Sequence, residues 1–193
     1  MSTRILLPNE FDLYQTHVMN LDSQSRFCRF GGYLNDGAVK AYLDNLKYTQ
    51  NIIIGHFDNN QLAGAALISF DSLFKKEICE LALSVDQSYR KRGLGKKLFK
   101  RAMLWACNLG FKKIHIQCLQ QNQWTVKQAK KLGFQLSNEE GEVYATMEPQ
   151  LWQKIHLPGL LTAEILEWNH YVLENFINSW YRCFLGVTQQ HAA

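Results

Sequence analysis

The sequence lacks any long apolar run. No stretch approaches the roughly 18–20 consecutive apolar residues of a bilayer-spanning helix. Near the amino terminus, the run Ile5–Leu7 is far shorter than the apolar region of a secretory signal peptide, and it ends at Pro8. These absences predict a cytoplasmic protein that is neither exported nor embedded in a membrane.

Cysteine, histidine and proline are also sparse. The five cysteines are scattered without a Cys-x-x-Cys spacing, so we expect reduced thiols rather than a disulfide framework or a zinc site. The six histidines form no pair at i,i+4 spacing, and no metal is predicted. Two of the three prolines, Pro149 and Pro158, lie close together. They predict a boundary between a body at residues 1–148 and an extension at residues 149–193.

The overall composition is that of a folded domain. Hydrophobic residues make up 47% of the 193 residues and charged residues 20%, which excludes intrinsic disorder and low complexity. A chain of this length predicts one domain with an appendage. The net charge of +4 is too small to indicate a partner by itself.

Hydrophobic periodicity predicts an ordered series of elements. Three features define the architecture: two opening helices, a hairpin with a four-residue turn, and a strand-helix-strand unit that requires a parallel strand pair. The sequence therefore predicts an α/β (α+β) fold with a mixed sheet flanked by helices. The expected helices are Asn9 or Glu10 to Leu21, Asp36–Leu46, Gly95–Leu109 and Trp124–Leu132, and the expected strands are Asn51–Phe57, Leu62–Phe70, Cys79–Val85, Ile114–Leu119, Phe134–Leu136 and Val143–Met147.

Positive charge is concentrated between the third strand and the helix that follows it. From Arg90 to Arg101 the sequence has seven basic residues and no acidic one. Gly93 and Gly95 let the backbone approach a ligand closely, and the unpaired amides of a helix start favour an anion. The segment predicts a phosphate site, with a solvated basic helix face as the alternative.

Two common phosphate motifs do not fit this segment. A P-loop has Ser or Thr after its Gly-Lys, where this sequence has Lys97. A dinucleotide fingerprint needs a third glycine where Leu98 stands. What remains is Arg90-x-x-Gly93-x-Gly95, directly after a strand.

This motif resembles the pyrophosphate loop of the GNAT superfamily of acetyl-CoA-dependent N-acetyltransferases, Gln/Arg-x-x-Gly-x-Gly/Ala. The family often carries an asparagine followed eleven residues later by Gly-Phe, which is matched by Asn122, Gly133 and Phe134. The two motifs occur in the family's order and in the expected strand and helix context. The resemblance implies the GNAT fold, in which the central parallel strand pair splays apart.

The resemblance covers roughly residues 1–148 and implies acetyl-CoA as the acetyl donor. The pantetheine arm would extend like an additional strand between Cys79–Val85 and Ile114–Leu119. The implied cofactor-binding groups are the backbone of Leu83, Ser84 and Val85, the amides of Lys91, Arg92, Gly93, Leu94, Gly95 and Lys96, the guanidinium of Arg90 or Arg92 near the pyrophosphate, and Asn122.

Within the superfamily, the sequence is more similar to the acetyltransferase domain of bacterial Pat-type protein-lysine acetyltransferases. The similar features are the stretch Ser23–Phe30, His17 before it, Glu80 thirteen residues ahead of Gly93, and Ala129 where many relatives have a tyrosine acid. The similarity implies a protein lysine as one candidate acceptor.

Glu80 is the candidate catalytic residue. An amine with a pKa near 10.4 is protonated at pH 7, and its neutral form costs about 4.6 kcal/mol. A positioned base must therefore help to remove the proton. The apolar strand around Glu80 predicts partial burial, which would suit a base that acts directly or through water. A carboxylate that faces solvent is the alternative.

The sequence does not identify the group that protonates the leaving thiolate. Tyr144, Tyr89 or water could protonate it, or it could leave unprotonated. A backbone amide near Leu83 is the expected donor to the carbonyl oxygen in the tetrahedral state. Cys79 and Cys118 are expected to pack in the core rather than to form an acetyl-enzyme.

Several readings of the acceptor side also stay open. His17 is a candidate for lining the substrate site. Arg26 and Arg29 could orient an acidic substrate group or form ion pairs among the helices. The extension carries a wide apolar helical stripe over Leu160–Leu185, which could pack on the body, form a homodimer contact or wall the acceptor groove.

The sequence thus predicts an acetyl-CoA-dependent N-acetyltransferase that acts by direct attack of a primary amine. The acceptor is a protein lysine or a small molecule. A non-catalytic acetyl-CoA sensor is an alternative. A nucleic-acid-binding module is disfavoured, because charge is even outside the basic segment and no recognition-helix pattern is present.

Overall fold

The computed structural model describes residues 2–59 and 61–149. The helices expected in the extension 149–193 lie outside these residues, and the predicted boundary at 148 stays a prediction. The described elements are β1 (Ser2–Ile5), η1 (Pro8–Glu10), α1 (Phe11–Met19), α2 (Ser23–Phe30), α3 (Asp36–Asp44), β2 (Asn51–Asp58), β3 (Gln61–Phe70), β4 (Ile78–Val85), η2 (Gln87–Tyr89), α4 (Leu94–Leu109), β5 (Lys113–Leu119), α5 (Gln123–Lys131), β6 (Gln135–Glu139) and β7 (Glu142–Met147).

The strands form one mixed sheet in the order β1-β2-β3-β4-β5-β7-β6. All neighbours are antiparallel except β4 and β5, which are parallel and are connected through α4. This arrangement confirms the predicted fold class. The predicted four-residue hairpin turn is wrong, because Asp58 and Gln61 pair with each other and only two residues connect β2 to β3.

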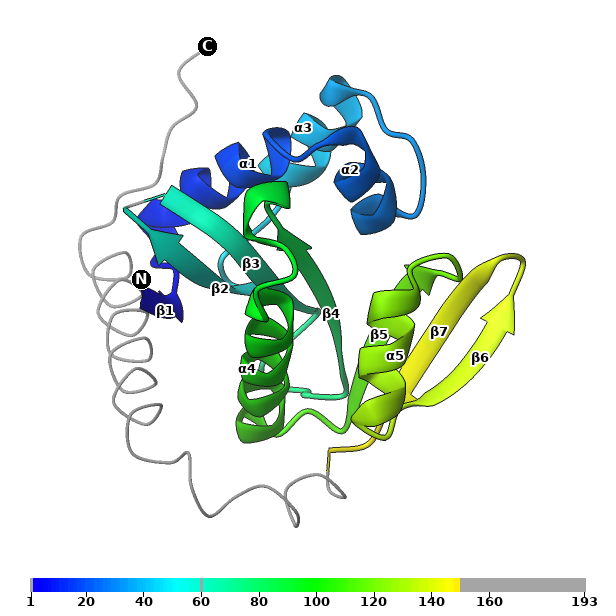
Figure 1. The fold of residues 1–193 in the computed structure, drawn as a ribbon. Coiled ribbons are helices and arrows are strands. Elements are labelled where there is room, and N and C mark those ends of the chain that lie inside the picture. Colours follow the sequence, from blue (N-terminus) through cyan, green and yellow to red (C-terminus); the bar gives the residue numbers. More distant parts are fainter. Residues whose placement is uncertain (1, 60, 150–193) are drawn as a thin grey trace, which may run out of the picture. The chain divides into compact units, whose positions relative to one another are not determined.

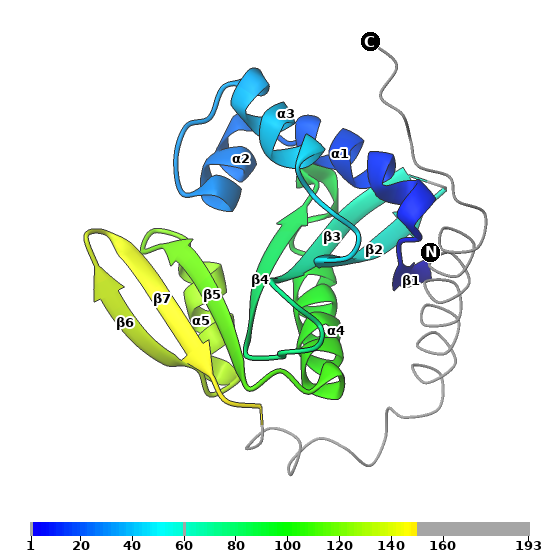
Figure 2. The ribbon, with the colours of Figure 1, turned by 180° about the vertical axis from the view of Figure 1, so that it is seen from behind.

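Helices cover both faces of the sheet (Figures 1 and 2). α4 packs on β2, β3 and β4 from one face, and α1 packs on β3 from the other. Alternate residues of β3 separate the two layers: Gly64 lies against Leu98 of α4, whereas Ala65 and Leu67 belong to the core beneath α1. α2 contacts β4 and β5, and α5 covers β5 and β7.

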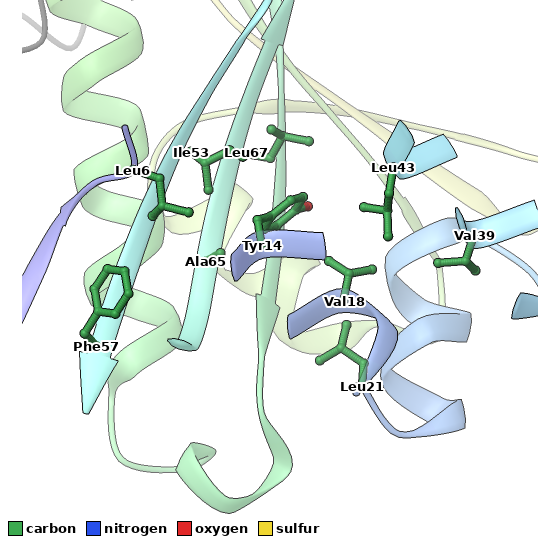
Figure 3. Close-up of a cluster of buried hydrophobic side chains, with 10 residues drawn as sticks. All are labelled: Leu6, Tyr14, Val18, Leu21, Val39, Leu43, Ile53, Phe57, Ala65 and Leu67. Atoms are coloured by element: carbon green, nitrogen blue, oxygen red, sulfur yellow. The ribbon is translucent and has the colours of Figure 1, made fainter. Parts of the chain in front are cut away.

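The core beneath α1 and α3 explains why the amino-terminal helices stay on the sheet. Leu6, Tyr14, Val18, Val39 and Leu43 meet side chains of β2 and β3 in one buried cluster, which also includes Leu21, Ile53, Phe57, Ala65 and Leu67 (Figure 3). Removal of apolar surface from water is the main stabilising contribution of such a cluster. It fixes the helix layer over the sheet face that carries Glu80.

Local signals account for the helix boundaries. The side chain of Asp22 caps α2 by accepting a hydrogen bond from the amide of Ser25, and Gly31 ends this helix with φ +71°. α3 is capped by Asn35, whose side chain accepts a hydrogen bond from the amide of Ala38. Neither α2 nor β1 was predicted as an element.

Candidate active site

The parallel strands β4 and β5 are paired over only three positions, ending at Glu80 and His115. Beyond them the strands diverge (Figure 1). On its other side β4 stays paired with β3 through Val85. The β5-facing backbone of Leu83, Ser84 and Val85 therefore has no β5 partner, which is the splayed geometry that the GNAT resemblance implies.

The turn after β4 leads directly into the start of α4. Lys91 and Gly93 have positive φ angles of +60° and +81°, and Gly93 occupies the N-cap position. No side chain caps this helix start. Its first amides are thus available for an anion, and the helix dipole favours one there.

The two arginines of the basic turn have different partners. Arg90 donates from Nη2 to Asp22 Oδ2 at 2.8 Å and to the hydroxyl of Ser25, and from Nε to the Val85 carbonyl. The guanidinium of Arg92 lies 5.8 Å from the ring centroid of Tyr89 and forms no ion pair within the described ranges. Arg90 therefore connects the turn to α2, and Arg92 is the better-placed of the two for a phosphate.

The start of α5 lies beside the start of α4. Asn122 is the N-cap of α5 and accepts a hydrogen bond from the amide of Thr125 at 3.3 Å. Two residues on, Trp124 has ring atoms only 3.0 Å from the place that a Cβ on Gly95 would take. The predicted phosphate-binding turn and Asn122 are thus brought to the same edge.

Glu80 lies at the last paired position of β4, and its side chain is exposed. The predicted partial burial of Glu80 is wrong, since this position faces a pocket rather than the core. The pocket has a volume of about 590 Å³ and lies between the ends of α2 and α3 and strands β2 to β5 and β7. Arg29, Tyr42, Gln117 and Glu142 line it together with Glu80.

Glu142 and Tyr144 form a hydrogen-bonded group beside this pocket. Glu142 Oε2 accepts from the Tyr144 hydroxyl at 2.7 Å and from Gln117 Nε2 at 2.6 Å. The hydrogen bond from Tyr144, followed by that from Gln117, lowers the pKa of Glu142, and the same bond to Glu142 raises the pKa of Tyr144. Tyr144 therefore keeps its proton at neutral pH. Tyr89 also donates to a carboxylate, Asp58 at 2.9 Å, but Asp58 does not line the pocket.

His17 is buried in α1 instead of lining the pocket. Its Nε2 lies 3.0 Å from the hydroxyl oxygen of Ser84 on β4. Burial lowers the pKa of His17, so the imidazole is neutral at pH 7. The contact couples α1 to the part of β4 predicted to bind pantetheine, which the sequence pattern did not reveal.

The cysteines of the central strands are packed as predicted. Cys79 and Cys118 are buried, as is Cys107 of α4. Burial raises the pKa of Cys79 and Cys107 to about 12 and that of Cys118 to about 11. Since the thiolate is the nucleophilic form, these values disfavour an acetyl-cysteine intermediate. Ala129 of α5 is also buried.

The described residues hold neither a membrane-spanning helix nor a cluster of metal ligands. Within residues 2–59 and 61–149, no helix has both the length and the apolar character needed to cross a bilayer. The same ranges hold no group of three potential metal-ligating side chains.

The diverging strands β4 and β5 and the glycine turn after β4 have the arrangement expected of an acetyl-CoA-dependent acetyltransferase. The chain belongs to the acetyltransferase (GNAT) family, whose model matches residues 19–134, more than half of its length. This membership confirms the predicted fold, the predicted enzyme class and acetyl-CoA as the acetyl donor.

Solved structures share this fold at low sequence identity. The GNAT domain of Streptomyces lividans PAT has 14% identity and a TM-score of 0.62, with 76% of this chain and 89% of that domain covered. A GNAT-family acetyltransferase from Streptococcus pneumoniae has 20% identity and a TM-score of 0.58, with 75% and 96% covered. The PaiA N-acetyltransferase of Thermoplasma acidophilum, in complex with coenzyme A, has 15% identity and a TM-score of 0.54, with 77% and 99% covered. No curated protein sequence matches the chain.

Proposed function

We propose that this acetyltransferase transfers the acetyl group of acetyl-CoA directly to a primary amine, with Glu80 as the general base. The supporting observation is the position of Glu80: it lines the pocket at the point where β4 and β5 part. A carboxylate there would face an amine bound in the pocket and a thioester held between the strands.

In the proposed step, the acetyl group passes from sulfur to nitrogen through a tetrahedral intermediate. The neutral amine nitrogen attacks the thioester carbonyl carbon, the C–N bond forms, and the tetrahedral intermediate loses its C–S bond. The amine proton passes to Glu80 directly or through water, and coenzyme A leaves as the thiolate. A backbone amide near Leu83 is the proposed donor to the carbonyl oxygen. Tyr144 is a better candidate than Tyr89 for protonating the thiolate, because its hydroxyl contacts the pocket residues Gln117 and Glu142.

The proposed cofactor contacts use backbone more than side chains. The unpaired edge of Leu83–Val85 would bond the pantetheine amides, and the amides of residues 91–96 would hold the pyrophosphate at the start of α4. Arg92 would add charge beside the pyrophosphate, and Asn122 would approach from α5. Arg90 would act mainly through its ion pair with Asp22, which ties the turn to α2.

Two acceptor classes remain in this proposal. The resemblance to Pat-type enzymes and the likeness to the S. lividans PAT domain support a protein lysine. The pocket of about 590 Å³ supports a small amine, because it falls in the size range of small-molecule sites. A non-catalytic acetyl-CoA sensor would bind the cofactor with the same strands but would turn over no amine.

The test is Glu80→Gln in the full chain, compared with wild type by acetyl-CoA binding and by coenzyme A release over a pool of amines and peptides. We expect cofactor affinity to stay within about threefold and turnover to fall about 10²- to 10⁴-fold, the usual contribution of a general base. Glu77→Gln is the matched control, since Glu77 is exposed, pairs with Lys112 and lies outside the pocket.

Other outcomes decide between the alternatives. Unchanged turnover in Glu80→Gln would remove Glu80 from the mechanism. Acetyl-CoA binding by the wild type without coenzyme A release for any amine would favour the sensor. No binding of acetyl-CoA at all would contradict the proposal as a whole.

A further inference from the structure

Arg29 presents a positive charge in the acceptor pocket without a carboxylate of its own. Its Nη2 donates to the hydroxyl oxygens of Tyr14 at 3.2 Å and of Tyr42 at 3.1 Å. The guanidinium also lies over the rings of Phe30 and Tyr42, at 5.2 and 5.7 Å from their centroids. Among the described residues, Arg29 forms no salt bridge, and its buried Nε has no hydrogen-bond acceptor.

Arg29 is partly buried, and a charge that loses part of its hydration is costly without an anion beside it. An arginine stays protonated throughout the physiological range, and two neutral hydroxyls do not neutralise it. Buried charges are normally paired. Arg26, one turn earlier in α2, follows this rule by pairing with Asp36, although its Nε also lacks an acceptor among the described residues. The difference within one helix indicates that the anion for Arg29 comes from outside the described chain.

The described residues line the pocket with one cationic side chain and three carboxylates. Arg29 is the one cationic side chain among its described lining residues, and it enters from the helix layer. Asp71, Glu80 and Glu142 are the carboxylates, of which Glu142 is already engaged by Gln117 and Tyr144. Arg29 and Glu80 line the same pocket yet form no ion pair. The same pocket of about 590 Å³ thus has Arg29 to bind an anion and Glu80 to accept a proton from an amine.

We propose that the acceptor is a small amine that also carries a carboxylate, with the carboxylate bound by Arg29 and Tyr42 and the amine directed to Glu80. This inference rests on the proposed function of Glu80. The Tyr42 hydroxyl accepts from Arg29 and so keeps its own proton for the ligand. A lysine side chain of a protein would place an amine in the pocket and leave Arg29 unpaired, so we favour a free amino acid or another amino carboxylate.

The experiment compares matched acceptors in the full chain with acetyl-CoA. Free α- and ω-amino acids are paired with the amines that remain after loss of the carboxylate, and lysine-containing peptides form a third arm. A charge-assisted hydrogen bond is worth enough for a preference of about 10- to 150-fold in kcat/KM. We expect at least one amino acid to exceed its matched amine by that factor and to exceed every peptide.

Variants assign the preference to its cause. Arg29→Gln should lower kcat/KM for the amino acid and abolish the ratio between the amino acid and its matched amine. Arg29→Lys should restore part of the ratio, because it returns the charge without the planar fork. Arg26→Gln is the control in the same helix and should keep the ratio, since Arg26 does not line the pocket. Unfolding curves for each variant establish that it is folded.

Binding gives a second readout that does not depend on turnover. Thermal shifts of wild type with coenzyme A are measured with each amino acid and its matched amine, and the same ratio is expected in the apparent affinities. Equal affinity and equal kcat/KM within each pair, or a preference for peptides, would overturn the inference while leaving the role of Glu80 intact. Loss of turnover in Glu80→Gln with the carboxylate preference retained in binding separates the two claims.

Discussion

Gly95→Ala probes the close approach between Trp124 of α5 and Gly95 in the proposed phosphate-binding turn. An added Cβ would lie 3.0 Å from both Cη2 and Cζ2 of Trp124, closer than side chains normally pack. The indole ring must therefore move away from α4. The same substitution in a Trp124→Ala background meets no ring, so four proteins form a double-mutant cycle.

Two opposing effects set the magnitude. Alanine is a better helix former than glycine by about 0.5–1 kcal/mol, which stabilises α4 in either background. Trp124 is 43% exposed, so more than half of its surface is covered and part of this packing is lost when the ring moves. At about 25 cal/mol per Å² over roughly 100 Å², that packing is worth about 2.5 kcal/mol. We expect Gly95→Ala to destabilise the wild type by about 1 kcal/mol and to stabilise Trp124→Ala by about 0.5 kcal/mol.

Urea unfolding of the four proteins measures the coupling. Circular dichroism is recorded at constant pH without cofactor, and acetyl-CoA affinity is measured separately because Gly95 also belongs to the proposed phosphate-binding turn. A coupling below about 0.3 kcal/mol would mean that Gly95 tolerates a side chain beside Trp124. The close approach of Trp124 to Gly95 described above would then be wrong.

Two further predictions concern stability. Gly55→Ala would bring a Cβ to 2.5 Å from Leu6 Cδ1 and 2.6 Å from Leu62 Cδ1, so we expect overpacking to cost about 1–3 kcal/mol in urea unfolding, while Gly32→Ala, with open space around it, should change little. Burial lowers the pKa of His17 in the folded state, so the unfolded state binds more protons below about pH 6.5 and stability falls as the pH decreases. The melting temperature of His17→Gln should therefore fall less than that of the wild type between pH 7.5 and 5.5, and an equal fall in both proteins would show that His17 does not contribute.

Strong hydrophobic periodicity made most of the fold predictable. α4 carries a continuous apolar face and ends at Gly110, and its observed limits differ from the prediction by one residue. α2 was missed because its eight residues are polar and cationic along most of their length. The capping side chain of Asp22 and the left-handed Gly31 would have indicated it. β1 was missed because four residues are too few to show an alternating pattern.

The candidate site was predictable in position but not in its electrostatics. The spacing of Arg90, Gly93 and Gly95 identified the turn, because that chemistry depends on local backbone conformation. The exposure of Glu80 could not be predicted, since the pocket in front of it is formed by α2, α3 and β7, which are distant in sequence. For the same reason, the sequence left open whether Arg26 and Arg29 orient an acidic substrate group or form ion pairs among the helices. In the structure, Arg26 pairs with Asp36, whereas Arg29 lines the pocket.

The short pairing between β4 and β5 also has a cost for the protein without its cofactor. Beyond Glu80 and His115, the facing edges of β4 and β5 carry amides and carbonyls that form no hydrogen bonds between these two strands. Unfilled strand edges are templates for pairing with other chains and hence for aggregation. A bound cofactor that lies along such an edge would block this association and add its binding free energy to that of the fold. Cofactor supply would thus control the lifetime of the enzyme as well as its rate.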